Sequence, residues 1–183
     1  MHYDVSYPDV ETLVIMPNAI SLLDEPILVE DNLPAVGDTL PFFQLVNHLL
    51  ADVTLESFQG KRKILHFFPG IDTPVSANSV RTLDMLGQTL ANTVILNISA
   101  DLPFTMTRFC NMENLVHGIN LSGMRGRDMF KNYGVLIMSS KLAGLPARAL
   151  MVADEQDRVL HVELVANLTS EPDYEASFKA LSR

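Results

Sequence analysis

The chain has 183 residues, close to the size of one ordinary domain, and 48% of them are hydrophobic while 19% are charged, which excludes a disordered or collagen-like protein. Thirteen Lys and Arg against 22 Asp and Glu give a formal net charge of −9, so we expect no nucleic-acid partner and no anionic membrane surface. No apolar stretch approaches the roughly 18 to 20 residues that span a bilayer, and the first residues lack the features of a secretory signal, so we expect a cytoplasmic protein.

The N-terminal region is irregular. Residues 1–35 contain four prolines and two short apolar runs, Leu13–Met16 and Ile27–Val29. Prolines interrupt regular structure, and short apolar runs can pair as strands. The region therefore predicts an extended arm with a hairpin, and we divide the chain into an extension over residues 1–20 and one globular domain over residues 21–183.

A strand, a helix and a second strand follow. The nearly all-apolar runs Lys63–Phe68 and Thr93–Ile98 predict strands buried on both faces. Between them, Val75–Leu90 carries apolar residues at helical spacing, with Thr73 at the N-cap and Pro74 at the first helical position. This βαβ unit predicts parallel strands joined by a right-handed crossover.

The remaining elements complete an α/β domain. Pro103–Met112 predicts a second helix and Arg125–Tyr133 a further short one. Ala147–Ala153 and Arg158–Val165, separated by a polar turn, predict an antiparallel hairpin, and Pro172–Leu181 predicts an amphipathic C-terminal helix. This order is typical of a thioredoxin-like fold, with a central mixed sheet flanked by helices and the N-terminal hairpin or arm.

Several polar motifs indicate no site. The basic run Lys61–Lys63 lacks the other residues of a P-loop and predicts a solvated entry to the first strand. The five histidines have no metal-ligand spacing, and the single cysteine, Cys110, excludes a disulfide framework or a cysteine-based zinc site, so we expect no metal. Ser76 does not lie in a nucleophile elbow, which disfavours a serine hydrolase.

The junction between the first strand and its helix carries the candidate chemistry. It reads FPGIDTPVS from Phe68 to Ser76. Such a junction directs free backbone N–H groups and the positive end of the helix dipole at the first helical turn. A thiol there would be held as a nucleophilic thiolate, but this chain has a hydroxyl. Taken alone, the segment also fits a plain helix cap.

The junction resembles the active-site loop of the thiol peroxidase branch of the peroxiredoxins, F-P-x-I-D-T-x-V-C. The resemblance covers about residues 36–181 and includes ISADLPF (98–104), RFC (108–110), LAGL (142–145), ARA (147–149) and EPDY (171–174). It implies the thioredoxin-like fold, reduction of hydrogen peroxide and alkyl hydroperoxides, thioredoxin as the reductant, no cofactor and a homodimer.

The resemblance also implies roles for individual residues. Ser76 stands where the family has its peroxidatic cysteine, and Cys110 matches the resolving cysteine. Thr73 matches the threonine that supports the reacting sulfur, and Arg148 matches the arginine that holds the thiolate and polarises the peroxide. We therefore expect the Arg148 guanidinium near Ser76, and Cys110 on the next helix, partly covered. Two prolines match those that shape the substrate pocket: Pro69 and Pro74.

Ser76 departs from the family at the reacting position. The family's thiolate attacks the peroxide O–O bond, and the resulting sulfenic acid forms a disulfide with the resolving thiol. Serine can perform neither step, so we expect the chain as written to be inactive. Two explanations stay open: an engineered cysteine-to-serine change, or a natural homologue that has lost peroxidase activity and acts as a binding or regulatory module.

Overall fold

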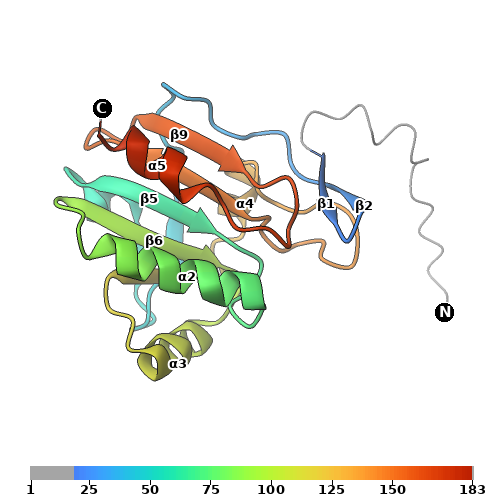
Figure 1. Ribbon diagram of the computed structural model, residues 1–183, viewed down its shortest axis with the longest axis horizontal. Helices are drawn as coiled ribbons and strands as arrows, with labels where there is room; N and C mark the ends of the chain where they lie inside the picture. The colour runs from blue at the N-terminus through green and yellow to red at the C-terminus, as the bar shows by residue number, and fades with distance from the viewer. Residues whose placement is uncertain (1–18, 183) are drawn as a thin grey trace.

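The computed structural model describes residues 19–182, so the Leu13–Met16 run lies outside the described residues and the domain boundary at residue 20 stays a prediction. A seven-stranded mixed sheet forms the centre of the molecule (Figure 1), in the order β4-β3-β7-β6-β5-β8-β9. Its strands are β3 (Gln44–Val46), β4 (Asp52–Thr54), β5 (Arg62–Phe67), β6 (Thr93–Ser99), β7 (Gly118–Ser122), β8 (Ala149–Ala153) and β9 (Val159–Leu164).

The pairing confirms the predicted βαβ unit. Strands β5 and β6 are parallel, and β7 continues the parallel set next to β6. Strand β8 pairs antiparallel with β5 and with β9. This pairing places the start of β8 beside the end of β5, so the segments that precede and follow these strands meet at one edge of the sheet.

Helices cover both faces of the sheet. The helices α2 (Pro74–Gly87), α3 (Pro103–Glu113) and α5 (Tyr174–Ala180) lie on one face, while the 3-10 helix η1 (Leu55–Phe58) and α4 (Asp128–Asn132) pack on the other. Helices α2 and α3 share a small core with the loop after β5, made by four buried side chains: Phe68, Ile71, Val80 and Met106. The two helices that carry Ser76 and Cys110 are thereby packed together.

The helix boundaries follow local signals. Thr73 caps α2 as predicted, because its side chain accepts a hydrogen bond from Ser76 N, and Pro74 begins the helix. Asp173 caps α5 by accepting from Ala176 N. Helix α3 ends at Asn114, whose φ of 56° is the left-handed conformation that commonly ends helices.

The structure corrects three sequence predictions. Strand β7 was not predicted, and neither were β3 and β4, because these short strands carry little apolar periodicity. The helix predicted at Arg125–Tyr133 is only the five-residue α4. Lys63, predicted to be solvated, is fully buried and pairs with Asp157.

A separate two-stranded hairpin lies in the N-terminal region, where an arm with a hairpin was predicted; of the two predicted apolar runs, only Ile27–Val29 overlaps it. It comprises β1 (Ala19–Leu22) and β2 (Glu25–Leu28), and it lies beyond one end of the main sheet in Figure 1. Its backbone bonds to distant segments: Ser21 N donates to Ala166 O, and Met138 N donates to Leu28 O. The hairpin is thus docked on the domain at the end where β8 begins. Of the helices within residues 19–182, none has the length and apolar character to cross a membrane.

Candidate active site

The first turn of α2 holds Ser76 in a defined hydrogen-bonding environment. Ser76 is fully buried. Its Oγ accepts a hydrogen bond from the Thr73 hydroxyl at 2.7 Å, and its backbone N donates to Thr73 Oγ1 at 3.3 Å. Because Thr73 is the N-cap, the local fold of the helix start itself fixes the distance between these two hydroxyls.

Arg148 provides the second donor to Ser76. It lies directly before β8, and its Nη2 donates to Ser76 Oγ at 3.2 Å. This confirms the predicted position of Arg148, although not its role. The sequence separation is bridged by the antiparallel pairing of β5 and β8, which brings the start of β8 to the end of β5.

The Arg148 guanidinium is itself held rigidly. Its Nε and Nη2 donate to Leu168 O at 3.4 and 3.3 Å, and Nη1 lies 3.5 Å from Ser79 Oγ. Only 1% of Arg148 is exposed, and burial lowers the pKa of the guanidinium from its usual high value. No carboxylate within residues 19–182 forms an ion pair with it. A buried cation is therefore directed at the oxygen of Ser76.

The loop between β5 and α2 is anchored by Asp101. Its Oδ2 accepts hydrogen bonds from Ile71 N and from the Ser99 hydroxyl, each at 2.8 Å. Asp101 and Ser99 belong to the ISADLPF segment. The ISADLPF segment thereby orients the FPGIDTPVS loop.

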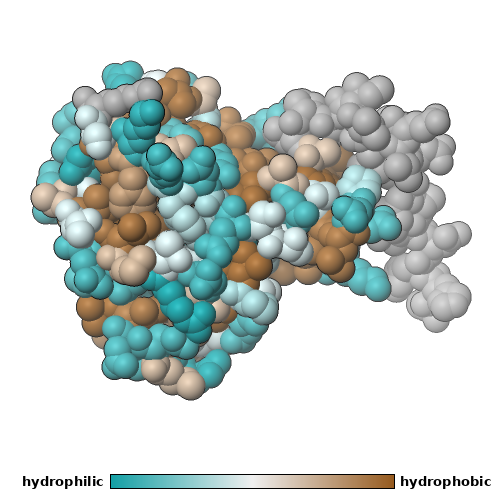
Figure 2. Space-filling view, viewed as in Figure 1, coloured by the Kyte–Doolittle hydropathy of each residue, from teal (hydrophilic) through white to brown (hydrophobic). Residues whose placement is uncertain are grey.

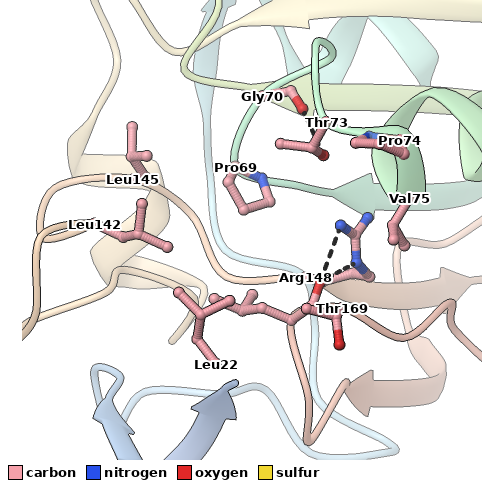
Figure 3. Close-up of a pocket in the computed structure, with 11 residues that line it drawn as sticks. Leu22, Pro69, Gly70, Thr73, Pro74, Val75, Leu142, Leu145, Arg148 and Thr169 are labelled. Atoms are coloured by element: carbon pink, nitrogen blue, oxygen red, sulfur yellow. Dashed lines mark hydrogen bonds between the residues drawn. The ribbon is translucent and has the colours of Figure 1, made fainter. Parts of the chain in front are cut away.

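A cavity of about 290 Å³ opens beside this turn. Pro69 and Pro74 line it; Figure 3 shows Thr73 and Pro74 above the Arg148 guanidinium, Pro69 to its left, and Leu142 and Leu145 across the cavity at the far left. The other lining residues are Leu22, Gly70, Val75, Leu168 and Thr169. The walls are mainly apolar, with polar groups concentrated at Thr73 and Arg148.

The apolar wall continues outward to the hairpin. A second cavity shares Leu22 and Leu142 with the first and is bounded by Leu23 and Ile27. Leu23 is 76% exposed at the hairpin tip, and Figure 2 shows apolar surface gathered over this region. Sequence reasoning assigned no role to these leucines, although the LAGL segment, which contains Leu142 and Leu145, already carried the resemblance.

Cys110 lies in a different place. It is on α3, 8% exposed, and lines a cavity of about 240 Å³ together with His48, Thr107 and Asn111. Among the described residues, none lines both this cavity and the one beside Ser76. Burial raises the pKa of the Cys110 thiol, and a hydrogen bond from Asn120 opposes that shift. The structure therefore places Cys110 on the next helix and mostly covered, as predicted, and does not bring it into contact with Ser76.

Within residues 19–182, no three His, Cys, Asp or Glu side chains lie together in a group that could bind a metal ion. His66, the histidine nearest in sequence to the junction, is fully buried and stacks on Phe68, with ring centroids 4.8 Å apart. The polar groups that the site brings together are Ser76, Thr73 and Arg148.

The chain is similar to known proteins over most of its length. A family model described as Redoxin matches residues 35–178. A thiol peroxidase from Vibrio cholerae is 40% identical over 162 residues, which cover 88% of this chain and 99% of that protein. The solved structure of a thiol peroxidase from Chromobacterium violaceum has a TM-score of 0.85 at 29% identity, covering 91% of this chain and 97% of its own. A peroxiredoxin-like protein from Aquifex aeolicus gives the same TM-score and identity over 91% and 98%.

Proposed function

The chain belongs to the redoxin family and has the thioredoxin-like fold of its thiol peroxidases, and from that membership we propose that position 76 is the reacting position of a hydroperoxide reductase recycled by thioredoxin. Ser76 makes the chain as written inactive in that reaction. The proposed substrates are hydrogen peroxide and alkyl hydroperoxides. No cofactor takes part in the proposed cycle.

The convergence of two donors on one buried atom carries this proposal. The Thr73 hydroxyl and Arg148 Nη2 both donate to Ser76 Oγ, at 2.7 and 3.2 Å. A serine hydroxyl is neutral at pH 7 and does not need a buried guanidinium beside it. A thiolate in the same position would gain a charge-assisted hydrogen bond from Arg148 and the favourable field of the α2 N-terminus. The surroundings of residue 76 therefore suit an anionic sulfur.

With cysteine at position 76, the reaction proceeds in balanced steps. The thiolate attacks one oxygen of the hydroperoxide, the S–O bond forms, the O–O bond breaks, and an alkoxide leaves and takes up a proton. Arg148 and Thr73 are the groups placed to stabilise the negative charge that moves onto the leaving oxygen. The sulfenic acid then reacts with the Cys110 thiolate, which forms a disulfide and releases hydroxide. Thioredoxin reduces that disulfide.

The first step can be tested alone. In a double variant, Ser76→Cys and Cys110→Ser, the sulfenic acid should persist because no resolving thiol remains. We expect one equivalent of cumene hydroperoxide to be consumed per chain, and mass spectrometry to detect the dimedone adduct on residue 76. The Cys110→Ser chain that keeps Ser76 is the matched control and should form no adduct. Absence of the adduct in the folded double variant would refute the proposed role of position 76.

We also propose a homodimer located in the cytoplasm, where free thiols stay reduced. The apolar surface around Leu22, Leu23 and Leu142 beside the site supports self-association. Because Cys110 is mostly buried and burial raises the pKa of its thiol, the dimer should not depend on a disulfide.

Sedimentation velocity tests the dimer. The parent chain and the Cys110→Ser chain should both sediment as dimers, with and without dithiothreitol, because the association is noncovalent. Any oxidised species of the parent should be an intermolecular disulfide or a mixed disulfide with a small thiol. A dimer that dissociates only upon reduction, or only in the Cys110→Ser chain, would show that Cys110 links the subunits.

A further inference from the structure

A row of polar side chains crosses three neighbouring strands and ends at Cys110; His66 and Asn97 are buried, and Asn120 is partly buried. The strand register pairs His66 on β5 with Asn97 on β6, and Asn97 with Asn120 on β7. His66 Nδ1 lies 3.1 Å from Asn97 Oδ1, and Asn97 Nδ2 lies 3.3 Å from Asn120 Oδ1. Asn120 Nδ2 lies 3.0 Å from Cys110 Sγ. Three consecutive hydrogen bonds therefore connect the interior of the sheet to the thiol.

All three hydrogen bonds of the row are donated in the same direction, from His66 toward Cys110. Because Asn97 Oδ1 can only accept, the His66 ring donates through Nδ1. Burial lowers the pKa of His66 to about 3, so the ring is neutral, and no donor in residues 19–182 reaches its Nε2. Each amide then accepts from one neighbour and donates to the next. Cys110 Sγ is the last acceptor, and aligned hydrogen bonds of this kind strengthen one another.

The sheet leaves room for this row at one glycine. A Cβ at Gly118 would overlap Asn97 Nδ2, so the Asn97 side chain fits only because residue 118 has no side chain. Burying amide groups in a sheet is costly unless they are hydrogen-bonded. Here each amide obtains its partners inside the row, and the amide of Asn120 is thereby held with its N–H group toward the sulfur.

We propose that Asn120 is a positioning residue for Cys110, held in one orientation by Asn97 and His66, and that its hydrogen bond favours the thiolate form of the resolving thiol. This inference rests on the proposed function for its catalytic meaning, since the resolving step needs a thiolate at Cys110. Burial of Cys110 disfavours the thiolate and therefore works against that step. The hydrogen bond from Asn120 opposes the effect of burial, and the adjacent 240 Å³ cavity gives an electrophile access to the sulfur.

The parent chain allows a direct test, because Cys110 is its only thiol. Its Sγ displaces iodide from iodoacetamide, with the thiol proton passing to buffer, and the pH dependence of that rate reports the thiolate fraction. A hydrogen bond donated to a charged group stabilises that group. Loss of the donor in Asn120→Leu should therefore raise the midpoint of the pH profile of alkylation by about one to two pH units. The other titratable groups facing the thiol, Asp84 on α2 and His48 in the loop after β3, are unchanged in this variant.

Asn111→Leu is the matched control, since Asn111 lines the same cavity but makes no hydrogen bond to Sγ. Its midpoint should equal that of the parent. Asn97→Leu keeps the donor but releases its orientation, and should give a smaller upward shift than Asn120→Leu.

Should Asn120→Leu fail to fold, Asn120→Ala removes the donor without adding bulk and must show the same upward shift. An unchanged midpoint in either folded variant overturns the proposal. A downward shift also overturns it, because it would mean that the row runs in the opposite direction and that the thiol donates to Asn120. Alkylation requires no peroxidase activity, so a failure of the proposed function at position 76 would be seen separately.

Discussion

The Ser76→Cys chain is expected to reduce cumene hydroperoxide with electrons from thioredoxin, roughly 10³-fold or more faster than the parent chain. The new sulfur would occupy the position that accepts from Thr73 and Arg148. It would also lie in the first turn of α2, where the helix dipole favours an anion. The rate is measured as oxidation of NADPH coupled through thioredoxin reductase and thioredoxin.

Two arginine variants in the Ser76→Cys background show whether the donor geometry matters. Arg148→Met should lower kcat/KM by roughly 10² to 10³-fold, because it removes a buried donor directed at the reacting atom. Arg125→Met is the matched control, since Arg125 is half exposed and pairs with Asp52 far from this turn; its activity should be unchanged. No gain in activity from the Ser76→Cys change, or equal losses from both arginine variants, would contradict the site described above.

Lys63→Met is expected to destabilise the chain by about 2 kcal/mol and to lower the Tm by about 4 to 8 °C. Lys63 is fully buried at the start of β5, and its ammonium group contacts the Asp157 carboxylate and donates to Lys61 O at 2.8 Å. Methionine fills a similar volume but leaves the carboxylate of Asp157, only 24% exposed, without its cation. A buried charge that loses its partner is costly.

Thermal unfolding followed by circular dichroism measures this loss. Lys61→Met is the control, because the neighbouring lysine is exposed and should change the Tm little. The double change Lys63→Met and Asp157→Asn should recover part of the stability, since it removes both charges. Equal effects of the Lys61 and Lys63 variants would show that the buried pair contributes nothing.

The predictable part of the fold is the part with strong periodicity and clear caps. Strands β5 and β6 are nearly all-apolar runs, and helix α2 carries apolar residues at helical spacing after a threonine cap, so the predicted boundaries were nearly correct. Strands β3, β4 and β7 are three to five residues long and partly exposed. They are strands because neighbouring strands provide hydrogen-bond partners, which is tertiary information.

The candidate site also has a part that the sequence predicts and a part that it does not. The Thr73 to Ser76 contact is local, and a helix cap predicts it. The approach of Arg148 depends on strand pairing and was predicted only through the family resemblance. The burial of Lys63 and the row from His66 to Cys110 could not be predicted, because three adjacent basic residues indicate solvent, and scattered asparagines carry no pattern in the sequence. Only the strand register brings His66, Asn97 and Asn120 side by side.

The small core that α2 and α3 share has a consequence for the order in which the molecule opens. Four buried side chains hold the first half of α2 and helix α3 to the loop after β5, whereas the second half of α2 packs on the sheet through Leu83, in a larger cluster. A segment with few apolar contacts opens at a lower free energy than the whole domain. Loss of the first two turns of α2 exposes Ile71 and Val80 and thereby removes the support of Met106 on α3. Amide hydrogens of the first two turns of α2 and of α3 should therefore exchange with solvent together, in one partial opening that leaves the second half of α2 and strands β5, β6 and β8 protected.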